Sequence, residues 1–255
     1  MRFASLGSGS QGNGLVVEVK NTRLLLDCGF TLKESIFRLS RLGLQPDMID
    51  GIIVTHEHDD HIGGVERFAR KFNIPVWLTY GTMRGIEKTF SSFSGINIIS
   101  SHQRFSIGAI EVQPYPVPHD AHEPTQFTFS DGALKLGVLT DTGCSTPHIK
   151  TILNDCHGLV LECNHDAQML TNSNYPQSLK QRIGGRLGHL ENSVSAELLA
   201  SLNCGLLQHL IAAHLSQKNN TPALAKAALG RAVGCEAEWV GVANQAVGFD
   251  WRQLI

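Results

Sequence analysis

Three histidines and two aspartates fall within six consecutive residues, and their spacing suits the binding of metal ions. Residues 56–61 read His-Glu-His-Asp-Asp-His and directly follow an apolar run at residues 51–54. An extended backbone sends alternate side chains to the same face, so His56 and His58 can reach one ion while Glu57 points away. Imidazole nitrogens are strong ligands for divalent transition metals. The segment therefore predicts a metal site at the end of a strand.

Asp60 and His61 extend this site. We expect the chain to turn into a helix at this point, which brings both side chains back over the same cavity. Two imidazoles and a nearby carboxylate–imidazole pair suit two adjacent divalent ions, which lower the pKa of a water and clamp the oxygens of an in-line displacement. The competing interpretation is a polar loop with chance histidines. The density of ligand-type residues at one strand end favours the metal site.

The elements that must position this loop alternate between short apolar strands and helices. We expect strands at residues 2–6, 15–20, 23–27, 52–55, 75–79, 109–117, 126–129, 134–140, 158–162 and 206–213. We expect helices at residues 31–42, 60–72, 82–89, 146–153, 177–183, 192–202 and 222–232. Mixed elements in both halves predict the α/β class, with two sheets packed face to face and helices outside. We expect one domain over residues 1–255.

Composition narrows the class of protein. The chain has 255 residues, of which 42% are hydrophobic, and this excludes a disordered chain. Lys and Arg number 21 against 23 Asp and Glu, so the net charge of -2 gives no global basic field for nucleic acid. No apolar run approaches the roughly 18 residues that span a bilayer, and the start lacks a secretory signal. Six cysteines form no Cys-x-x-Cys pair, so we expect reduced thiols in a cytoplasmic protein without membrane contact.

The His-x-His-x-Asp-His pattern of residues 56–61 resembles the motif of the metallo-β-lactamase superfamily. The resemblance implies a four-layer αββα sandwich and two divalent metal ions as cofactors. It also implies ligands at other strand ends, where His119, Asp141 and His214 match the superfamily's positions. The superfamily's early aspartate matches Asp27, which would support the histidine loop from behind the ligands.

By this resemblance, each ion has its own set of ligands. The implied ligands are, for the first ion, His56, His58 and His119; for the second, Asp60, His61 and His214; and, bridging both, Asp141. His122 competes for the place of His119, and we expect Cys144 to be a structural thiol rather than a ligand. A set made only of nitrogen and oxygen ligands is compatible with Zn²⁺, Mn²⁺ or Fe²⁺.

Five further segments look like the YycJ/WalJ subgroup of that superfamily. They are residues 5–13, 118–124, 161–166, 188–192 and 214–220. The resemblance implies a phosphodiesterase with nucleic acid as its partner, DNA rather than RNA. The expected activity is that of a DNA exonuclease, 5′ to 3′, with a metal-bridging hydroxide for in-line attack. The alternatives are a small-molecule phosphodiesterase, a thioesterase or RNA-processing nuclease of the superfamily, and a non-enzymatic metal-binding module. The residues leave the oligomeric state open.

Two residues have expected roles in proton transfer. Besides ligating, Asp60 could orient the attacking hydroxide or accept its proton. His189 is the candidate donor to a phosphate oxygen or to the leaving group, against the alternative of a surface residue beside a helix. Glu162 and His165 follow another predicted strand, and we expect them to lie behind the ligands or beside the substrate.

A run of basic residues precedes His189. Lys180, Arg182 and Arg186 fall within seven residues, and we expect them to bind substrate phosphates. The alternative is a solvated helix and loop. The glycine-rich residues 7–14 either present backbone N–H groups to phosphate or form a tight turn between two strands.

Overall fold

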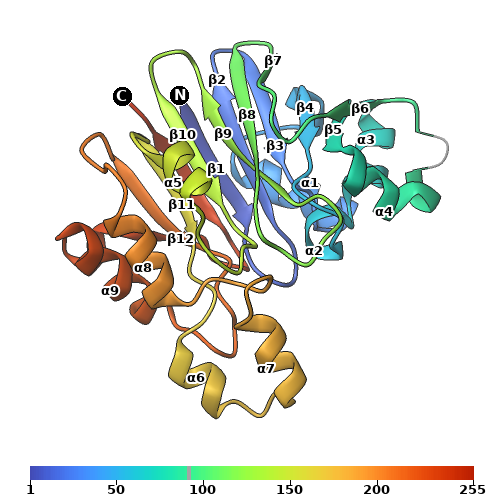
Figure 1. Cartoon of the computed structure of the whole chain (residues 1–255). Helices are drawn as coiled ribbons and strands as arrows, with labels where there is room; N and C mark the ends of the chain where they lie inside the picture. Colours follow the sequence, from blue (N-terminus) through green and yellow to red (C-terminus); the bar gives the residue numbers. More distant parts are fainter. Residues whose placement is uncertain (91–92) are drawn as a thin grey trace.

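Two β-sheets form the centre of the structure, a computed structural model that describes residues 1–90 and 93–255 (Figure 1). Among these residues each sheet has seven strands. In hydrogen-bonding order, the first sheet contains β14 (Phe249–Gln253), β1 (Arg2–Gly7), β2 (Gly14–Val19), β3 (Thr22–Leu26), β4 (Gly51–Ile53), β5 (Val76–Thr79) and β6 (Ile96–Ile99). The second contains β13 (Gly241–Val242), β12 (His209–Ala213), β11 (Gly158–Glu162), β10 (Lys135–Leu139), β9 (Thr125–Ser130), β8 (Ile110–Pro116) and β7 (Phe105–Ile107). The first half of the chain therefore builds the first sheet, which the final strand completes.

Several helices cover the outer faces of the two sheets. The helices of the described residues are α1 (Leu32–Arg41), η1 (Pro46–Met48), α2 (Asp59–Ile62), α3 (Val65–Phe72), α4 (Tyr80–Phe90), α5 (Pro147–Leu153), α6 (Ala167–Asn172), α7 (Gln177–Ile183), α8 (Asn192–Ala200), α9 (Pro222–Val233) and η2 (Ala237–Trp239). Leu39 of α1 and Phe68 of α3 pack against the first sheet. Leu198 of α8 and Leu229 of α9 pack against the second. The expected αββα layers are confirmed.

The two sheets share an apolar core. Phe3 and Val17 from the first sheet pack with Val112, Phe127 and Val138 from the second, and all five side chains are buried. Burying one such side chain contributes about 1.5–3 kcal/mol. This core fixes the positions of the strands and therefore the positions of the residues that follow them. None of the helices in the described ranges is both long and apolar enough to cross a membrane.

The prediction of a single helix at residues 60–72 is wrong. The structure has two helices there, α2 and α3, with Gly63 and Gly64 between them. A Cβ atom at Gly64 would lie 1.9 Å from the carbonyl oxygen of Phe30, so only glycine allows the chain to pass this closely. The interruption lets α2 end beside the metal-binding loop while α3 packs on the sheet.

Helices α6 and α7 form a lobe that projects from one end of the sandwich (Figure 1). The bounds expected for α7, residues 177–183, agree with the structure. Helix α6 was not expected, although Asp166 caps it by accepting a hydrogen bond from the N–H of Met169 at 2.9 Å. The lobe matters for function because α7 reaches the cleft described next.

Candidate metal centre

The side chains of the candidate site follow neighbouring parallel strands. Strands β10, β11 and β12 run parallel in the second sheet. Asp141 follows β10, Glu162 is the last residue of β11, and His214 follows β12. In the first sheet β3 and β4 are also parallel, and Asp27 follows β3. Because the carboxyl ends of parallel strands meet at one edge, residues far apart in the sequence converge here.

Three of these residues adopt left-handed backbone conformations. The φ angles of Asp27, Asp141 and His214 are 60°, 53° and 54°. This region costs a non-glycine residue about 1 kcal/mol or more, and such strain concentrates at functional sites. Of the three, Asp141 and His214 line the cleft, whereas Asp27 contacts His61 from behind.

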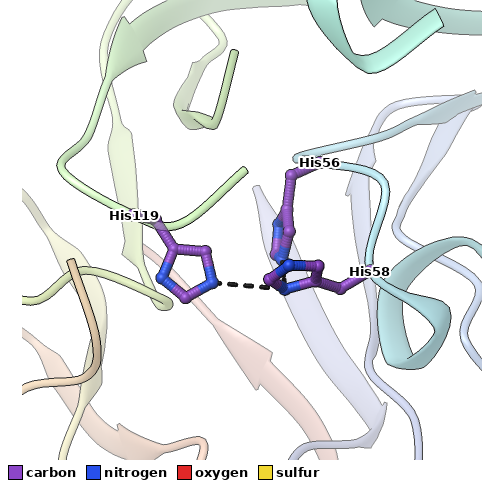
Figure 2. A group of neighbouring side chains, drawn as sticks. All are labelled: His56, His58 and His119. Atoms are coloured by element: carbon purple, nitrogen blue, oxygen red, sulfur yellow. Dashed lines mark hydrogen bonds between the residues drawn. The ribbon is translucent and has the colours of Figure 1, made fainter. Parts of the chain in front are cut away.

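The first trio of ligand-type side chains consists of His56, His58 and His119 (Figure 2). Nδ1 of His58 lies 3.1 Å from Nε2 of His56 and 3.3 Å from Nε2 of His119. His56 and His58 come from the loop after β4, and His119 faces them from the segment after β8. Three imidazole nitrogens that face one another at this spacing fit a single divalent ion.

The second trio consists of Asp60, His61 and His214. Oδ2 of Asp60 lies 3.4 Å from Nε2 of His61 and 3.4 Å from Nε2 of His214. The two histidines are buried, whereas Asp60 is partly exposed toward the cleft. One carboxylate oxygen and two imidazole nitrogens again present the atoms that a divalent ion prefers.

Asp141 stands between the two trios. Its Oδ2 atom lies 3.2 Å from Nε2 of His61, and its Oδ1 atom lies 3.4 Å from Nε2 of His214. Asp141 also lies within ligand distance of His56. Oδ2 is buried and accepts no well-formed hydrogen bond, and a buried anionic oxygen without a donor is costly. A cation would satisfy it, so the residues present fit divalent metal ions bound beside Asp141.

Polar partners fix which nitrogen each imidazole turns to the cavity. Nδ1 of His61 donates to Oδ2 of Asp27 at 2.7 Å, and Asp27 accepts two further bonds from the backbone N–H and hydroxyl of Thr55. Nδ1 of His119 donates to the carbonyl oxygen of Gly188 at 3.1 Å. In both rings the proton sits on Nδ1, so the lone pair of Nε2 points at the metal position. Asp27 therefore lies where the resemblance places it, behind a ligand.

The electrostatic balance differs across the cluster. Burial, and then the neighbouring His61, hold the pKa of His56 well below its usual range. Burial opposes a charge on His61, but the carboxylates of Asp141, Asp27 and Asp60 together outweigh it and raise that pKa well above the usual range. Burial is likewise outweighed at His214, where Asp141, Asp60 and Glu162 together raise the pKa to about 9. The side around Asp141 thus stabilises positive charge, which divalent ions can supply in place of protons.

Glu162 and His189 form a second polar unit beside the ligands. Nδ1 of His189 donates to Oε1 of Glu162 at 2.8 Å, and Oε2 accepts from the backbone N–H groups of Thr142 and Leu190. Glu162 is fully buried, whereas the ring of His189 reaches the cleft. Burial alone lowers the pKa of His189, but the charge and hydrogen bond of Glu162, together with the charge of Asp141, outweigh burial and raise that pKa above the usual value.

Five of the candidate ligands, His58, Asp60, His119, Asp141 and His214, line a cleft of about 330 Å³. Four aspartates line it, Asp59, Asp60, Asp120 and Asp141. Among the described residues that line it, Arg182 is the only Lys or Arg. The aspartates thus outnumber Arg182 and give the cleft an excess of negative charge. Bound metal cations would offset this charge and make the cleft suitable for an anion.

The three expected substrate-binding cations lie in different places. Nε of Arg182 donates to Oδ2 of Asp120 at 2.6 Å, across the cleft from α7 to the loop after β8. Nζ of Lys180 instead donates to the carbonyl oxygen of Thr171, and Arg186 is exposed. Neither Lys180 nor Arg186 lines the cleft. Their role in substrate binding stays a prediction without support from the cleft.

The remaining sequence candidates also have definite places. His122 is exposed and contacts Oε1 of Glu57 at 2.5 Å, so His119 rather than His122 joins the first trio. His165 is buried, and its Nδ1 lies 3.3 Å from Oδ1 of Asn164, whose amide donates to the carbonyl oxygen of His214. Cys144 joins none of the ligand groups within the described residues.

Sequence reasoning missed two polar residues of the site. Asn13 donates from Nδ2 to both the backbone oxygen and Oδ2 of Asp60, each at 3.2 Å. Asp120 has Oδ1 3.5 Å from Nε2 of His119. The available signals were weak: Asn13 closes the glycine-rich segment, and Asp120 directly follows a candidate ligand.

Comparison with known proteins agrees with this geometry. A family model described as the metallo-β-lactamase superfamily matches residues 7–198. The exodeoxyribonuclease YycJ of Bacillus anthracis is 34% identical over 253 residues, which cover 95% of this chain and 93% of that protein. The exodeoxyribonuclease WalJ of Streptococcus pneumoniae serotype 2 (strain D39 / NCTC 7466) is 32% identical over 230 residues, or 88% of this chain and 85% of that protein.

A solved structure supports the fold. The Zn²⁺-bound PqqB of Methylobacterium extorquens superimposes with a TM-score of 0.78 over 100% of both chains, at 16% sequence identity. At that identity the likeness concerns the fold alone. It shows the same architecture over the whole length of this chain.

Proposed function

Because the chain belongs to the metallo-β-lactamase superfamily, and so to its metal-dependent hydrolases, we propose that it is an exodeoxyribonuclease that degrades DNA 5′ to 3′. The similarity to proteins named exodeoxyribonucleases over nearly the whole chain carries this proposal. The ligand-type cluster and the cleft above it supply the matching chemistry. The six free cysteines fit a reducing cytoplasmic location.

The proposed ligands of two Zn²⁺ or Mn²⁺ ions, with Fe²⁺ also compatible, are His56, His58 and His119, then Asp60, His61 and His214, with Asp141 shared. When bound, two such ions lower the pKa of a water molecule between them and neutralise the charge of a phosphodiester. Asp60 can also accept a hydrogen bond from the attacking water, since its side chain is partly open to the cleft.

His189 is the proposed proton donor to the leaving oxygen. Its Nδ1 is engaged by Glu162, so Nε2 is the nitrogen that is free to face the cleft. The charge of Glu162 raises the pKa of His189, which favours the protonated form of the ring that a proton donor needs. Glu162 thus orients the ring and sustains its charge without touching substrate.

Arg182 is the proposed phosphate contact of the protein itself. Only its Nε is engaged by Asp120 among the bonds of the described residues, which leaves the two Nη groups for an anion. A guanidinium with free N–H groups binds phosphate oxygens in a fixed geometry. Lys180 and Arg186 lie outside the cleft lining and could meet only a longer strand.

A nuclease assay tests the proposal. Purified protein with Mn²⁺ or Zn²⁺ is given 5′-labelled single- and double-stranded DNA, RNA of the same sequence, and a chromogenic small diester. We expect release of short 5′-labelled products from DNA, and a His189→Ala variant that is at least about 100-fold slower. His148→Ala, which changes an exposed histidine on α5, is the matched control. Hydrolysis of the small diester with no cleavage of DNA would rule out the nuclease.

A small phosphodiester is the second candidate substrate. The modest volume of the cleft and its single lining cation favour a compact ligand over a long duplex, which needs a larger charged surface. The chromogenic diester in the same assay decides between the two candidates.

A further inference from the structure

The glycine loop, residues 8–13 between β1 and β2, contacts the second ligand trio directly. The backbone N–H of Asn13 donates to the carbonyl oxygen of Asp60 at 2.7 Å. The side-chain amide of Asn13 donates to Oδ2 of Asp60 at 3.2 Å and lies 3.1 Å from Nε2 of His61. Asn13 is buried, so these contacts are shielded from water. One residue of the loop thus fixes both the main chain and the carboxylate of Asp60.

The other end of the loop holds the third ligand of that trio. The hydroxyl of Ser8 accepts a hydrogen bond from the backbone N–H of His214 at 2.9 Å. The same hydroxyl donates to Oδ1 of Asn13 at 3.1 Å, and Oδ1 also accepts the N–H of Gly9 at 2.8 Å. Asp60 and His214, which lie 154 positions apart, are therefore joined through one short loop.

The shape of the glycine loop depends on a residue near the end of the chain. Oε1 of Gln245 accepts the backbone N–H of Gln11, and Nε2 of Gln245 donates to the carbonyl oxygen of Gly12, both at 2.9 Å. The side-chain amide of Gln245 thus pairs with main-chain groups of the loop, as a neighbouring strand would in a sheet. It also lies so close that a Cβ atom at Gly9 would be 2.5 Å from Oε1.

Gln245 is itself held in place by contacts that involve none of the candidate ligands. It lies in a tight turn between β13 and β14, where the side chain of Asn244 accepts the N–H groups of Ala246 and Val247. The carbonyl oxygen of Gln245 accepts a bond from Arg38 at 3.0 Å. Because these bonds hold the main chain of Gln245, its side chain can hold the glycine loop in one position.

The first trio has no such connection. Within residues 1–90 and 93–255, no hydrogen bond joins the glycine loop to His56, His58 or His119. A change in the loop should therefore act on one metal site and spare the other.

We propose that Gln245 is a positioning residue for the second metal ion. It fixes the glycine loop, and the loop holds Asp60 and His214 at ligand spacing through Asn13 and Ser8. The inference rests on the two-ion site of the proposed function, but not on the identity of the substrate. Partners behind metal ligands typically change metal affinity by about 10- to 100-fold.

Metal titration of the full chain tests the inference. Metal-free protein is titrated with Zn²⁺ against a competing chelator, and native mass spectrometry counts the ions. We expect Gln245→Met, which keeps length but loses both polar atoms, to raise the Kd of the second ion about tenfold, and Asn13→Ala to raise it by up to about 100-fold. Gln245→Glu keeps the acceptor for Gln11 and should fall between wild type and Gln245→Met. The first Kd should not change.

Gln253→Ala is the matched control. Like Gln245, Gln253 uses its side-chain amide to bond to the main chain: it donates to the carbonyl oxygens of Met1 and Leu254. It contacts neither the glycine loop nor a candidate ligand. Both of its Kd values should equal those of wild type, and thermal unfolding of the metal-free variants confirms that each is folded.

Three results would overturn the inference: an unchanged second Kd in Gln245→Met, an equal loss of both ions, or a wild type that binds only one ion. Two bound ions without DNA cleavage would instead refute the proposed function and leave this inference standing.

Discussion

The two trios of candidate ligands differ in charge and in the side chains that hold them in place. The first, His56, His58 and His119, consists of imidazoles alone. The second includes the carboxylate of Asp60 and lies beside Asp141. Four polar side chains contact its members and none of the first trio, and these are Ser8, Asn13, Asp27 and Asn164, whereas the hydroxyl of Thr55 contacts His61 and also His56 of the first trio.

Like charges explain the difference in support. Asp27 and Asp60 approach His61 from two sides, and Asp141 lies 3.2 Å from the same ring. Carboxylates brought this close repel one another unless cations and hydrogen-bond donors hold them. The protein supplies the donors, and the ions supply the charge. Imidazoles carry no negative charge and need no such restraint, so the first trio requires only the bonds that orient its rings.

Removal of the shared carboxylate should have the largest effect, because it damages both sites. We expect Asp141→Asn to weaken both ions and to slow turnover by roughly 10³-fold or more. Asparagine tolerates the left-handed backbone at this position, so the variant should fold. Asp155→Asn, at another left-handed position with φ 59°, is the matched control. Two tightly bound ions in Asp141→Asn would contradict the bridging role.

Loss of the charge on Glu162 should separate proton transfer from metal binding. We expect Glu162→Gln to lower kcat by roughly 10²-fold while both ions stay bound. The folded-state pKa of His189 lies above its usual value because of Glu162. Without that charge the pKa of His189 falls, so the ring loses its proton at a lower pH. The alkaline limb of the profile of kcat against pH therefore shifts to lower pH. Profiles of kcat against pH for the two proteins provide the measurement. Superimposable profiles would remove His189 from the proton-transfer step.

Asp27 offers the sharpest contrast between the sites. It contacts His61 of the second trio and reaches the first trio only through Thr55. We expect Asp27→Asn to weaken the second ion by about 10- to 100-fold, since the amide is a poorer acceptor for Nδ1 of His61. The first ion should be nearly unaffected. Titration with Zn²⁺ measures both constants, and an equal loss at both sites would show that the trios share one support.

Much of the fold and of the ligand set could be predicted from the sequence. Four candidate ligands lie within residues 56–61, and Asp141 and His214 follow apolar runs whose parallel arrangement brings their ends together. Strand β11 and helix α7 have the bounds that the pattern predicts. The division of α2 from α3 could not be predicted, since it depends on how closely Gly64 passes Phe30 in space.

Contacts between distant segments account for the rest. Asn13 and Gln245 act through bonds that span 47 and 234 positions, and no local pattern records these. Of the three cations in the basic run, only Arg182 lines the cleft, and a substrate role for Lys180 and Arg186 stays a prediction. Leu179, Arg182 and Ile183 share one face of α7 and line the cleft, whereas Lys180 points elsewhere because a helix turns about 100° per residue. Charge density along the sequence does not give direction in space.

The smallest expected effect concerns Asp120, the carboxylate nearest to the first trio. Its Oδ1 atom lies 3.5 Å from Nε2 of His119, while Oδ2 engages the half-exposed Arg182. An exposed ion pair contributes at most about 1 kcal/mol, so Asp120→Asn should lower the KM for DNA by no more than about fivefold as Arg182 becomes free for phosphate. Arg182→Ala should raise that KM.

The same variant tests whether the first site is built from neutral ligands alone. If Asp120 only holds Arg182, Zn²⁺ titration of Asp120→Asn should show two unchanged constants. Glu111→Gln, which breaks the exposed Arg104–Glu111 pair, is the control for removing a surface acid. Loss of the first ion in Asp120→Asn would make Asp120 a ligand. The first site would then carry a carboxylate of its own, and the contrast in charge between the two trios would have to be abandoned.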